Sequence, residues 1–464
     1  MRLAAAKLAH LVNRGAFRRS VAANIAFLPR TFSASPYSVG LSGERGCSVL
    51  EEAKRYPTEC RARHSPVPQN KNSAIQTRRR EDKLRIVTLC YEWPPVGGGG
   101  GRAAQSIAEA LARRGHQVRV QTVRFAETPA HEVVANVNVY RTWGFRRLAD
   151  QCTHLEMAGY IISSALPTIG HLAEFEPDLI HAHFAVPTGA LAFASTRLWR
   201  LPYVITVHLG DVPGAIPEQT DTLFRWLNPL IRPIWRHAAA VVGVSKFVGD
   251  LAQQAYGREP TIIPNGISLA GRPAIPQPTT TVPRLIFVGR LNSQKNLHYL
   301  PPILVKLREL KWELDIVGDG AERGALETAF AEVDLSERVH FHGWLGRPAV
   351  EARLSAAEIF VLPSLVEGLS VAVLEALKFG LLLVGSDIPA LHECVTSGVN
   401  GYLLSLNSPE QWFERLKRLL SDAELRLAMR QRSWEMVERF DLEQIASQYE
   451  VLFQRIATEN SKNR

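Results

Sequence analysis

Short apolar runs alternate with longer helical stretches from residue 84 onward, and this alternation most constrains the fold. The runs are continuous in Val, Ile and Leu, which is typical of strands buried on both faces of a parallel sheet. The stretches between them are long enough for crossover helices, so we predict an α/β fold. The predicted strands are LRIVTLCY (84–91), QVRVQTV (117–123), DLIHAHF (178–184), YVITVHL (203–209), AAVVGVS (239–245), RLIFVGR (284–290), ELDIVGD (313–319), RVHFHGW (338–344), EIFVLPS (358–364) and LLLVGSD (381–387).

A proline-rich segment, SLAGRPAIPQPTTTVP (268–283), divides these strands into two sets. Its four prolines exclude a helix interior or a central strand, so we interpret it as an interdomain linker. We therefore predict two doubly wound, Rossmann-like domains at 83–270 and 284–440, joined by a linker at 271–283. Ligands of such folds bind at the carboxyl ends of the strands, so two facing domains would enclose a central cleft.

The net charge of +9 belongs to one end of the 464-residue chain. Residues 1–80 hold 15 Lys and Arg against 4 Asp and Glu, a charge of +11, and the remainder carries −2. A nearly neutral body argues against nucleic-acid binding. We predict that residues 1–82 are a basic, disordered extension. Its acid-free start, residues 1–43, also resembles a transit peptide or a basic segment that lies on anionic lipid.

Cysteine usage and apolar run length bear on the compartment. The five cysteines are scattered and form no CxxC, which suits a reducing cytosol rather than a disulfide scaffold. The longest uncharged runs, 157–173 and 179–196, are broken by Pro and His. They are too interrupted for a spanning helix, and we expect them to be buried elements.

A glycine-rich loop, VGGGGGR (96–102), follows the first strand and precedes a predicted helix over 103–115. Glycines expose backbone N–H groups and admit close approach by a phosphate or a sugar. We predict a ligand-cradling loop, with a merely flexible loop as the alternative. NAD binding is disfavoured, because EWPPV lengthens the turn and the next strand ends without an acidic residue.

Two further segments place charges at predicted strand ends in the second domain. Arg290 and Lys295 follow the first strand, where two cations suit an anionic leaving group such as a nucleoside diphosphate. Glu367 precedes a predicted helix and Glu375 lies in its second turn, on a different face. The N–H groups of Leu369, Ser370 and Val371 would face a phosphate between the two acids. Solvated surface charges are the alternative in both cases.

Histidines form a third set of candidates. His208 ends a predicted strand, where it would contact a ligand, although a structural role is the commoner one for a lone histidine. His181/His183 and His340/His342 are H-x-H pairs on one strand face each. We predict structural roles for them and no metal site, because zinc needs a third ligand that is not identifiable. GxxxxGK[ST], HExxH, GxSxG and D-x-D motifs are absent.

Together these motifs resemble the retaining nucleotide-sugar glycosyltransferases of the GT-B fold, specifically glycosyltransferase family four. They occur in family order over residues 84–464. The matching segments are PPVGGGGGR (94–102), IHAH (180–183), TVHLGD (206–211), VGVSK (242–246), IIPNGI (262–267), VGRLNSQKN (288–296), IVGDG (316–320), VHFHGW (339–344), VLPSLVEGLSVAVLEAL (361–377) and GSDIPALHE (385–393).

The resemblance implies roles for the candidate residues. Arg290 and Lys295 would hold the donor diphosphate, Glu375 the nucleotide ribose, and Glu367 the hydroxyls of the transferred sugar. Leu369, Ser370 and Val371 would donate backbone N–H groups. His208 would line the donor-sugar site, and Gly98 and Gly99 would approach the donor phosphate and the acceptor. A last helix within 441–464 would cross back onto the first domain. This sequence departs from the family's usual residues at two places, Leu369-Ser370 after the Glu-Gly dipeptide and Ser386-Asp387 near residue 385. Both departures bear on which sugar is transferred.

The implied activity is metal-independent and cofactor-independent transfer of a sugar, with retention, from a nucleoside diphosphate sugar. The acceptor would be a glycan or a lipid-linked molecule, and the enzyme cytoplasmic, in peripheral contact with the inner face of a membrane. Two alternatives stay open: a non-hydrolysing nucleotide-sugar epimerase, and a non-catalytic nucleotide-sugar-binding protein.

Overall fold

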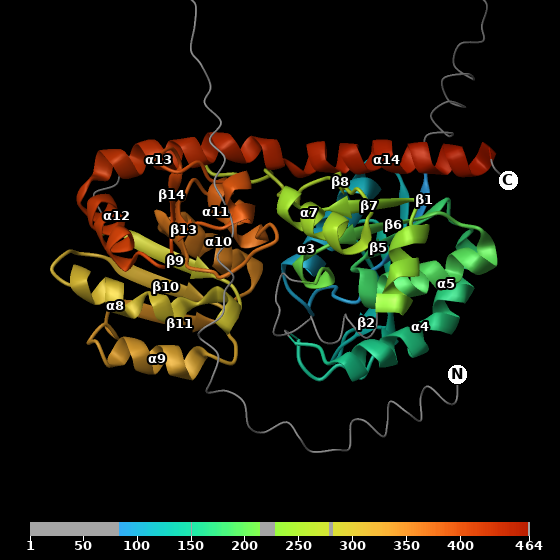
Figure 1. Ribbon diagram of the computed structural model, residues 1–464, viewed down its shortest axis with the longest axis horizontal. Helices are drawn as coiled ribbons and strands as arrows, with labels where there is room; N and C mark the ends of the chain where they lie inside the picture. The colour runs from blue at the N-terminus through green and yellow to red at the C-terminus, as the bar shows by residue number, and fades with distance from the viewer. Residues whose placement is uncertain (1–82, 150, 214–227, 278–281, 463–464) are drawn as a thin grey trace, which may run out of the picture. The chain divides into compact units, whose positions relative to one another are not determined.

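A computed structural model describes residues 83–464 except 150, 214–227, 278–281 and 463–464. These residues form two sheets of mainly parallel strands, each with helices packed against it (Figure 1). The α/β fold class is thereby confirmed. The basic extension, residues 1–82, which we predict to be disordered, lies outside the described residues.

The first sheet holds eight strands in the order β3-β4-β2-β1-β5-β6-β7-β8 within the described part of the chain. Its central strands β1, β5 and β6 are buried on both faces, as continuous apolar runs predict. The strands are β1 (Arg85–Leu89), β2 (Gln117–Arg124), β3 (His131–Val134), β4 (Val137–Trp143), β5 (Leu179–His183), β6 (Tyr203–Val207), β7 (Ala240–Gly243) and β8 (Thr261–Ile262); the helices include α3 (Gly99–Arg113), α4 (His154–Phe175), α5 (Ala190–Trp199) and α7 (Lys246–Tyr256).

A β-hairpin at one edge of this sheet was not predicted. β3 pairs with β4 in antiparallel fashion, whereas β4 pairs with β2 in parallel. The hairpin turns at Ala135 and Asn136, whose φ angles of 48° and 65° lie in the left-handed region that a tight hairpin turn requires. Ala is an unusual residue there, so the turn signal is weak. The two strands are also only half buried, so they lack the continuous apolar run of a central strand.

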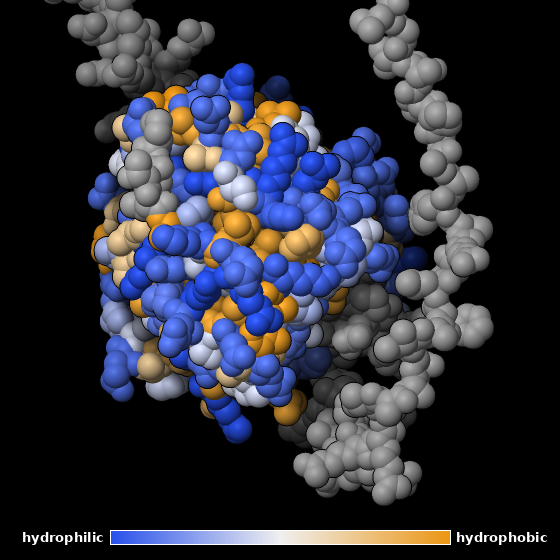
Figure 2. Space-filling view, turned by 90° about the vertical axis from the view of Figure 1, so that its left-hand side faces the viewer, coloured by the Kyte–Doolittle hydropathy of each residue, from blue (hydrophilic) through white to orange (hydrophobic). Residues whose placement is uncertain are grey.

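The second sheet holds six strands in the order β11-β10-β9-β12-β13-β14, and all of its pairings are parallel. The face of the molecule on the side of this domain is mainly hydrophilic, with a group of apolar side chains in its middle (Figure 2). The strands are β9 (Arg284–Val288), β10 (Glu313–Val317), β11 (Val339–Gly343), β12 (Ile359–Leu362), β13 (Leu382–Ser386) and β14 (Gly401–Leu404); the helices are α8 (Pro301–Leu304), α9 (Arg323–Ala331), α10 (Arg347–Ala356), α11 (Val371–Lys378), α12 (Pro409–Ser421) and α13 (Ala423–Met436).

A buried ionic cluster joins α13 to the start of β12. The Glu358 carboxylate accepts from Arg426 Nε at 3.0 Å and from Arg430 Nη1 at 3.1 Å, and all three side chains are less than a tenth exposed. Breaking a buried pair of this kind leaves an uncompensated charge and costs about 3–5 kcal/mol. The cluster therefore fixes where α13 lies on the sheet.

The C-terminal helix α14 (Leu442–Lys462) packs against the first sheet and its helix α3. Glu450 accepts from Arg114 Nε at 2.7 Å and lies 3.0 Å from His116 Nε2. Deeper in, the Tyr449 hydroxyl lies 3.1 Å from Thr206 Oγ1 of β6. The chain thus returns from α13 to the first domain (Figure 1).

One expectation about burial is wrong. Residues 157–173, which we expected to be buried, lie within α4, and this helix has an exposed side. Tyr160, Ser164 and Leu172 are buried, whereas Ile162 and Leu166 are more than three-quarters exposed. An apolar composition favours burial of both sides of a helix. It does not show whether another element covers each side. Among the described helices, none is long and apolar enough to cross a membrane.

Candidate functional site

The glycine loop is held against the segment that follows β1. Gly97 adopts a φ of 88°, and Gly98 N–H donates to Glu92 Oε2 at 3.3 Å. A Cβ atom on Gly101 would lie 1.9 Å from the backbone oxygen of Glu92, so no side chain fits there. The helix α3 starts at Gly99, earlier than predicted, so three of the five glycines form its first turn. The N–H groups of these three glycines have no intrahelical hydrogen-bond acceptor, because no helical carbonyl lies four residues before them.

The same glycines lie beside the second domain. A Cβ atom on Gly98 would be 3.8 Å from Arg290 Cζ, and one on Gly99 would be 3.6 Å from Val371 Cγ2. Arg290 follows β9, and Val371 is the first residue of α11. The glycine loop, the end of β9 and the start of α11 therefore meet at one junction, which we call the candidate site.

Lys295 and Glu367 form an ion pair inside this site. Lys295 Nζ lies 2.6 Å from Glu367 Oε1, and the two side chains are 14% and 6% exposed. Lys295 ends a 3-10 turn that Asn292 caps through a bond from Lys295 N–H to its Oδ1 at 3.3 Å. The sequence predicts both residues as ligand contacts but not their contact with each other.

Glu375 lies on α11 and faces a cation of the first domain. Arg102 Nη1 is 3.9 Å from Glu375 Oε1. Burial raises the pKa of Glu375, and the nearby Arg102 guanidinium opposes that rise. Arg102 is a candidate that the sequence reasoning missed, although it directly follows the glycine run.

The start of α11 is positioned by a buried asparagine. Asn265 Nδ2 donates to the Leu369 carbonyl at 2.9 Å, and Asn265 is 3% exposed. Ser370 caps the helix by its backbone alone, with no side-chain bond. The N–H groups at Leu369, Ser370 and Val371 precede the first intrahelical bond, so they suit a bound anion. Asn265 was also missed, although it lies in the IIPNGI segment.

His208 completes the site from the first domain. A Cβ atom on Gly100 would lie 3.4 Å from His208 Cγ, and His208 Nε2 is 3.4 Å from His183 Nδ1. Burial lowers the pKa of His208 to about 4, so the ring is neutral at neutral pH. Asp211 accepts from His208 N–H at 2.8 Å and from Ala185 N–H at 2.7 Å, and burial raises the pKa of Asp211 to about 7.

The H-x-H pairs have structural partners. His181 is buried with Nε2 at 2.8 Å from Thr206 Oγ1, and His342 Nε2 lies 2.6 Å from Asp315 Oδ1. Within the part of the chain that the structure describes, no cluster of His, Cys, Asp or Glu is arranged to hold a metal ion.

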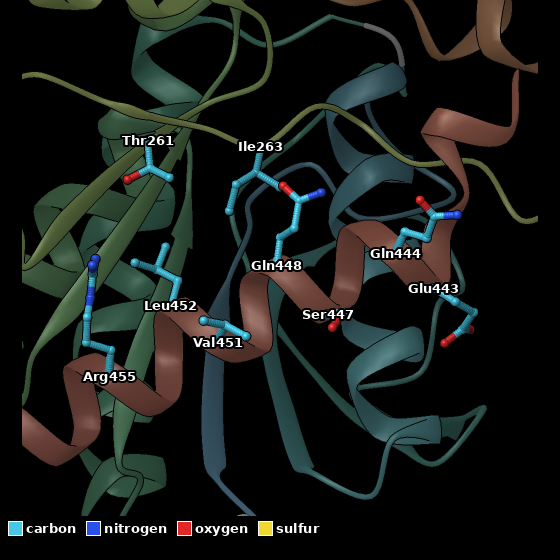
Figure 3. Close-up of a pocket in the computed structure, with 9 residues that line it drawn as sticks. All are labelled: Thr261, Ile263, Glu443, Gln444, Ser447, Gln448, Val451, Leu452 and Arg455. Carbon is cyan, nitrogen blue, oxygen red and sulfur yellow. The ribbon is translucent and has the colours of Figure 1, made fainter. Parts of the chain in front are cut away.

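A hollow of about 700 Å³ lies away from this junction, along α14 (Figure 3). Its lining brings together polar and apolar side chains of α14 and the two residues Thr261 and Ile263. It has neither the glycine N–H groups nor the paired charges of the candidate site. We therefore take the junction, and not this hollow, as the candidate site.

Two doubly wound sheets whose loops meet in this way have the arrangement of the GT-B fold. The family described as Glycosyltransferase Family 4 matches residues 97–270, and Glycosyl transferases group 1 matches residues 273–436. A glycogen synthase from Mycobacterium tuberculosis is 30% identical over 349 residues, covering 68% of this chain and 81% of the relative. The chain belongs to the GT-B glycosyltransferases that resemble family four.

Solved structures agree on the fold. The sucrose-phosphate synthase of Thermosynechococcus elongatus superposes with a TM-score of 0.71 at 20% identity, over 81% of this chain and 100% of that one. The Anabaena protein HepE in complex with UDP-glucose superposes with a TM-score of 0.61 at 18% identity, over 82% of this chain and 100% of that one. The predicted GT-B architecture is thereby confirmed.

Proposed function

We propose that this glycosyltransferase moves a sugar from a nucleoside diphosphate sugar to a glycan or lipid-linked acceptor, with retention of anomeric configuration and without a metal ion. The observation that carries the proposal is the meeting of the glycine loop with Arg290 and the start of α11. Two helix N-termini and a guanidinium within one junction suit a diphosphate.

In this proposal, Arg290 and Lys295 bind the diphosphate and the N–H groups of Leu369, Ser370 and Val371 share its charge. Glu375, beside Arg102, accepts from the ribose hydroxyls, and Glu367 accepts from hydroxyls of the transferred sugar. Lys295 already holds Glu367 at 2.6 Å, which supports this arrangement because the pair would orient sugar and phosphate together.

The reaction then needs no protein nucleophile. The bond between the sugar anomeric carbon and the phosphate oxygen breaks, and the electron pair leaves with the nucleoside diphosphate. The acceptor hydroxyl attacks on the same face, and its proton passes to the departing phosphate oxygen. Arg290, Lys295 and the α11 N-terminus stabilise the growing charge of the leaving group. His208 is neutral at neutral pH, so it would act there as a hydrogen-bonding group rather than as a cation.

The test uses two variants, Arg290→Ala and Lys295→Ala, in the full chain. Each should lower transfer by about 100- to 1000-fold, the loss found when a single oxyanion donor is removed, while the melting transition persists. Donors are first ranked by thermal shift with UDP-, GDP- and ADP-sugars, and products are then identified by mass analysis. Near-native transfer by both variants would contradict diphosphate binding at these residues.

The two alternatives predict different products. An epimerase would convert the nucleotide-sugar without any acceptor, and a binding protein would shift its melting temperature without forming product. Proton NMR of the anomeric signal in the product tests retention. The cytoplasmic location is part of the proposal, and it is supported by the free thiols of Cys90, Cys152 and Cys394.

A further inference from the structure

Glu92 brings a carboxylate to the start of α3, close to where the proposed diphosphate would bind. Gly98 N–H donates to Glu92 Oε2 at 3.3 Å. Helix α3 has no acidic residue in its first turn, and Gly98, its N-cap, has no side chain that could accept a bond. Helix N-termini favour a negative charge. Glu92 supplies that charge from the loop after β1, and it has no role in the transfer chemistry proposed above.

The direction of this carboxylate is fixed from the core of the first domain. The Tyr91 hydroxyl donates to Glu92 Oε1 at 3.2 Å, so each carboxylate oxygen has a donor. Tyr91 is buried, its ring meets the Phe184 ring edge-on with centroids 5.3 Å apart, and the Arg146 guanidinium lies 5.7 Å from its centre. A bond from a buried hydroxyl therefore directs Glu92 toward the glycine loop rather than toward solvent.

The glycine loop is shaped around Glu92. Gly97 adopts a φ of 88°, which favours glycine, and a Cβ atom there would lie 2.6 Å from Glu92 Cβ and 2.8 Å from Glu92 Oε2. A Cβ atom on Gly101 would in turn meet the Glu92 backbone oxygen. Any larger residue at Gly97 would push the carboxylate away from Gly98. Two of the five glycines thus leave room for Glu92 and not for a ligand.

A phosphate at the same place would compete with the carboxylate. A Cβ atom on Gly98 would lie 3.8 Å from Arg290 Cζ, so Gly98 N–H and the guanidinium proposed to bind the diphosphate are close neighbours. Each residue has a single backbone N–H donor, and two anions at one position repel each other. A diphosphate that reaches Gly98 must therefore displace Glu92 Oε2, and one that stays at Arg290 still faces its charge.

We propose that Glu92 is a positioning residue of the donor site, which holds the glycine loop in shape while the site is empty and gives up Gly98 N–H when a phosphate group binds. The proposal rests on the proposed function, from which the phosphate is taken. The charge of Glu92 lowers the affinity of the site for a nucleoside diphosphate, so it favours release of the leaving group after transfer. If Glu92 only shaped the loop, removing its charge would weaken nucleotide binding or leave it unchanged.

The experiment compares nucleotide binding by the native full chain and by Glu92→Gln, using titration calorimetry with UDP, GDP, ADP and inorganic pyrophosphate. The glutamine amide oxygen can still accept from Gly98 N–H, but the side chain carries no charge. The dissociation constant of the probe that binds best should fall about fivefold, the effect of one charge at a helix N-terminus. The difference should shrink as the salt concentration increases, because ions screen the repulsion.

The matched control is Glu174→Gln, which removes the same charge elsewhere. Glu174 lies at the end of α4, just before β5, and so at the amino ends of the strands rather than at their carboxyl ends. Its carboxylate accepts from Arg119 Nη2 at 2.9 Å. Glu174→Gln should bind the same probe as the native chain does. An equal gain in both variants would mean that overall charge, and not Glu92, sets the affinity, and it would overturn the proposal.

A second measurement, amide hydrogen exchange, follows the glycine loop without any ligand. Exchange at Gly98 should be about fivefold faster in Glu92→Ala than in the native chain, because a hydrogen bond of ordinary strength is lost. It should stay close to the native rate in Glu92→Gln, which keeps an acceptor. This rescue by glutamine separates the bond to Gly98 from the charge. A native exchange rate in Glu92→Ala would overturn the proposal.

The two measurements also separate this proposal from the proposed function. Weaker or unchanged nucleotide binding by Glu92→Gln, with binding by the native chain intact, would overturn the role of Glu92 alone. A native chain that binds none of the four probes would overturn the proposed function together with the displacement of Glu92 by phosphate. Hydrogen exchange would still decide whether Glu92 holds the glycine loop.

Discussion

Lys295 and Glu367 lie 72 residues apart in the sequence and 2.6 Å apart in the fold, as a nearly buried ion pair. Each is a proposed ligand contact, yet each also neutralises the other in the absence of ligand. The pair therefore links the stability of the second domain to its chemistry.

The first prediction is that these two residues are energetically coupled. Lys295→Met or Glu367→Gln alone should lower the free energy of unfolding by about 3 kcal/mol, because each leaves a buried charge unpaired. The double variant should be less destabilised than the sum of the single variants. Urea denaturation of the four proteins measures the coupling, and simple additivity would show that the pair contributes little.

The second prediction concerns acid stability. Burial lowers the pKa of His181 to about 3 and that of His208 to about 4. Unfolded histidine has a pKa near 6.5, so below that pH only the unfolded chain takes up these protons. The contribution of these two histidines to stability should be fully present above about pH 6.5. It should fall toward pH 4, with the unfolding constant rising about tenfold per pH unit for each such histidine.

The matched variant is His181→Asn, which should reduce the proton uptake on unfolding by about one between these pH values. Asp211, whose pKa is raised to about 7 by burial, acts in the opposite sense, since its stabilising proton is lost as the pH rises. It is present in both proteins, so the difference between their pH profiles isolates His181. Identical slopes would mean that His181 is protonated in the folded chain.

The third prediction uses two glycines of different surroundings. Gly101→Ala should cost about 3 kcal/mol or more, because its Cβ atom would lie 1.9 Å from the Glu92 backbone oxygen. Gly170→Ala, in α4, meets no atom within 4 Å and should stabilise the protein by about 0.5–1 kcal/mol. Chemical denaturation compares them, and similar effects at both positions would contradict the tight fit of the glycine loop.

The fourth prediction concerns Arg102, which faces Glu375 across the candidate site. Without its charge the pKa of Glu375 should rise further, because the guanidinium opposes the effect of burial. Arg102→Ala should weaken nucleotide binding about fivefold near neutral pH, a loss of the size expected for a half-exposed pair. Affinity should recover as the pH increases.

Calorimetric titration with the preferred nucleotide measures this dependence, and Arg102→Lys should restore most of the affinity. A loss in Arg102→Ala that does not change with pH would assign Arg102 a contact with the ligand rather than an effect on Glu375.

Local patterns in the sequence predicted much of the fold. Ten apolar runs mark strands that the structure contains, and the start of α11 lies between Glu367 and Glu375, as the spacing indicates. The half-buried hairpin β3–β4 and the short strand β14 were not predicted. Strands at or near a sheet edge carry neither a long apolar run nor a strong turn signal. Those elements depend on neighbours for their pairing.

The sequence by itself determined the two-domain α/β pattern and the positions of the candidate residues at strand ends and helix starts, because these follow from periodicity within a few residues. Only the tertiary structure decided that Lys295 pairs with Glu367, that Arg102 approaches Glu375 and that Asn265 holds the Leu369 carbonyl. It also decided that Ile162 and Leu166 of α4 are largely exposed. Contacts between distant segments depend on how the sheets and helices pack, and no local pattern contains that information.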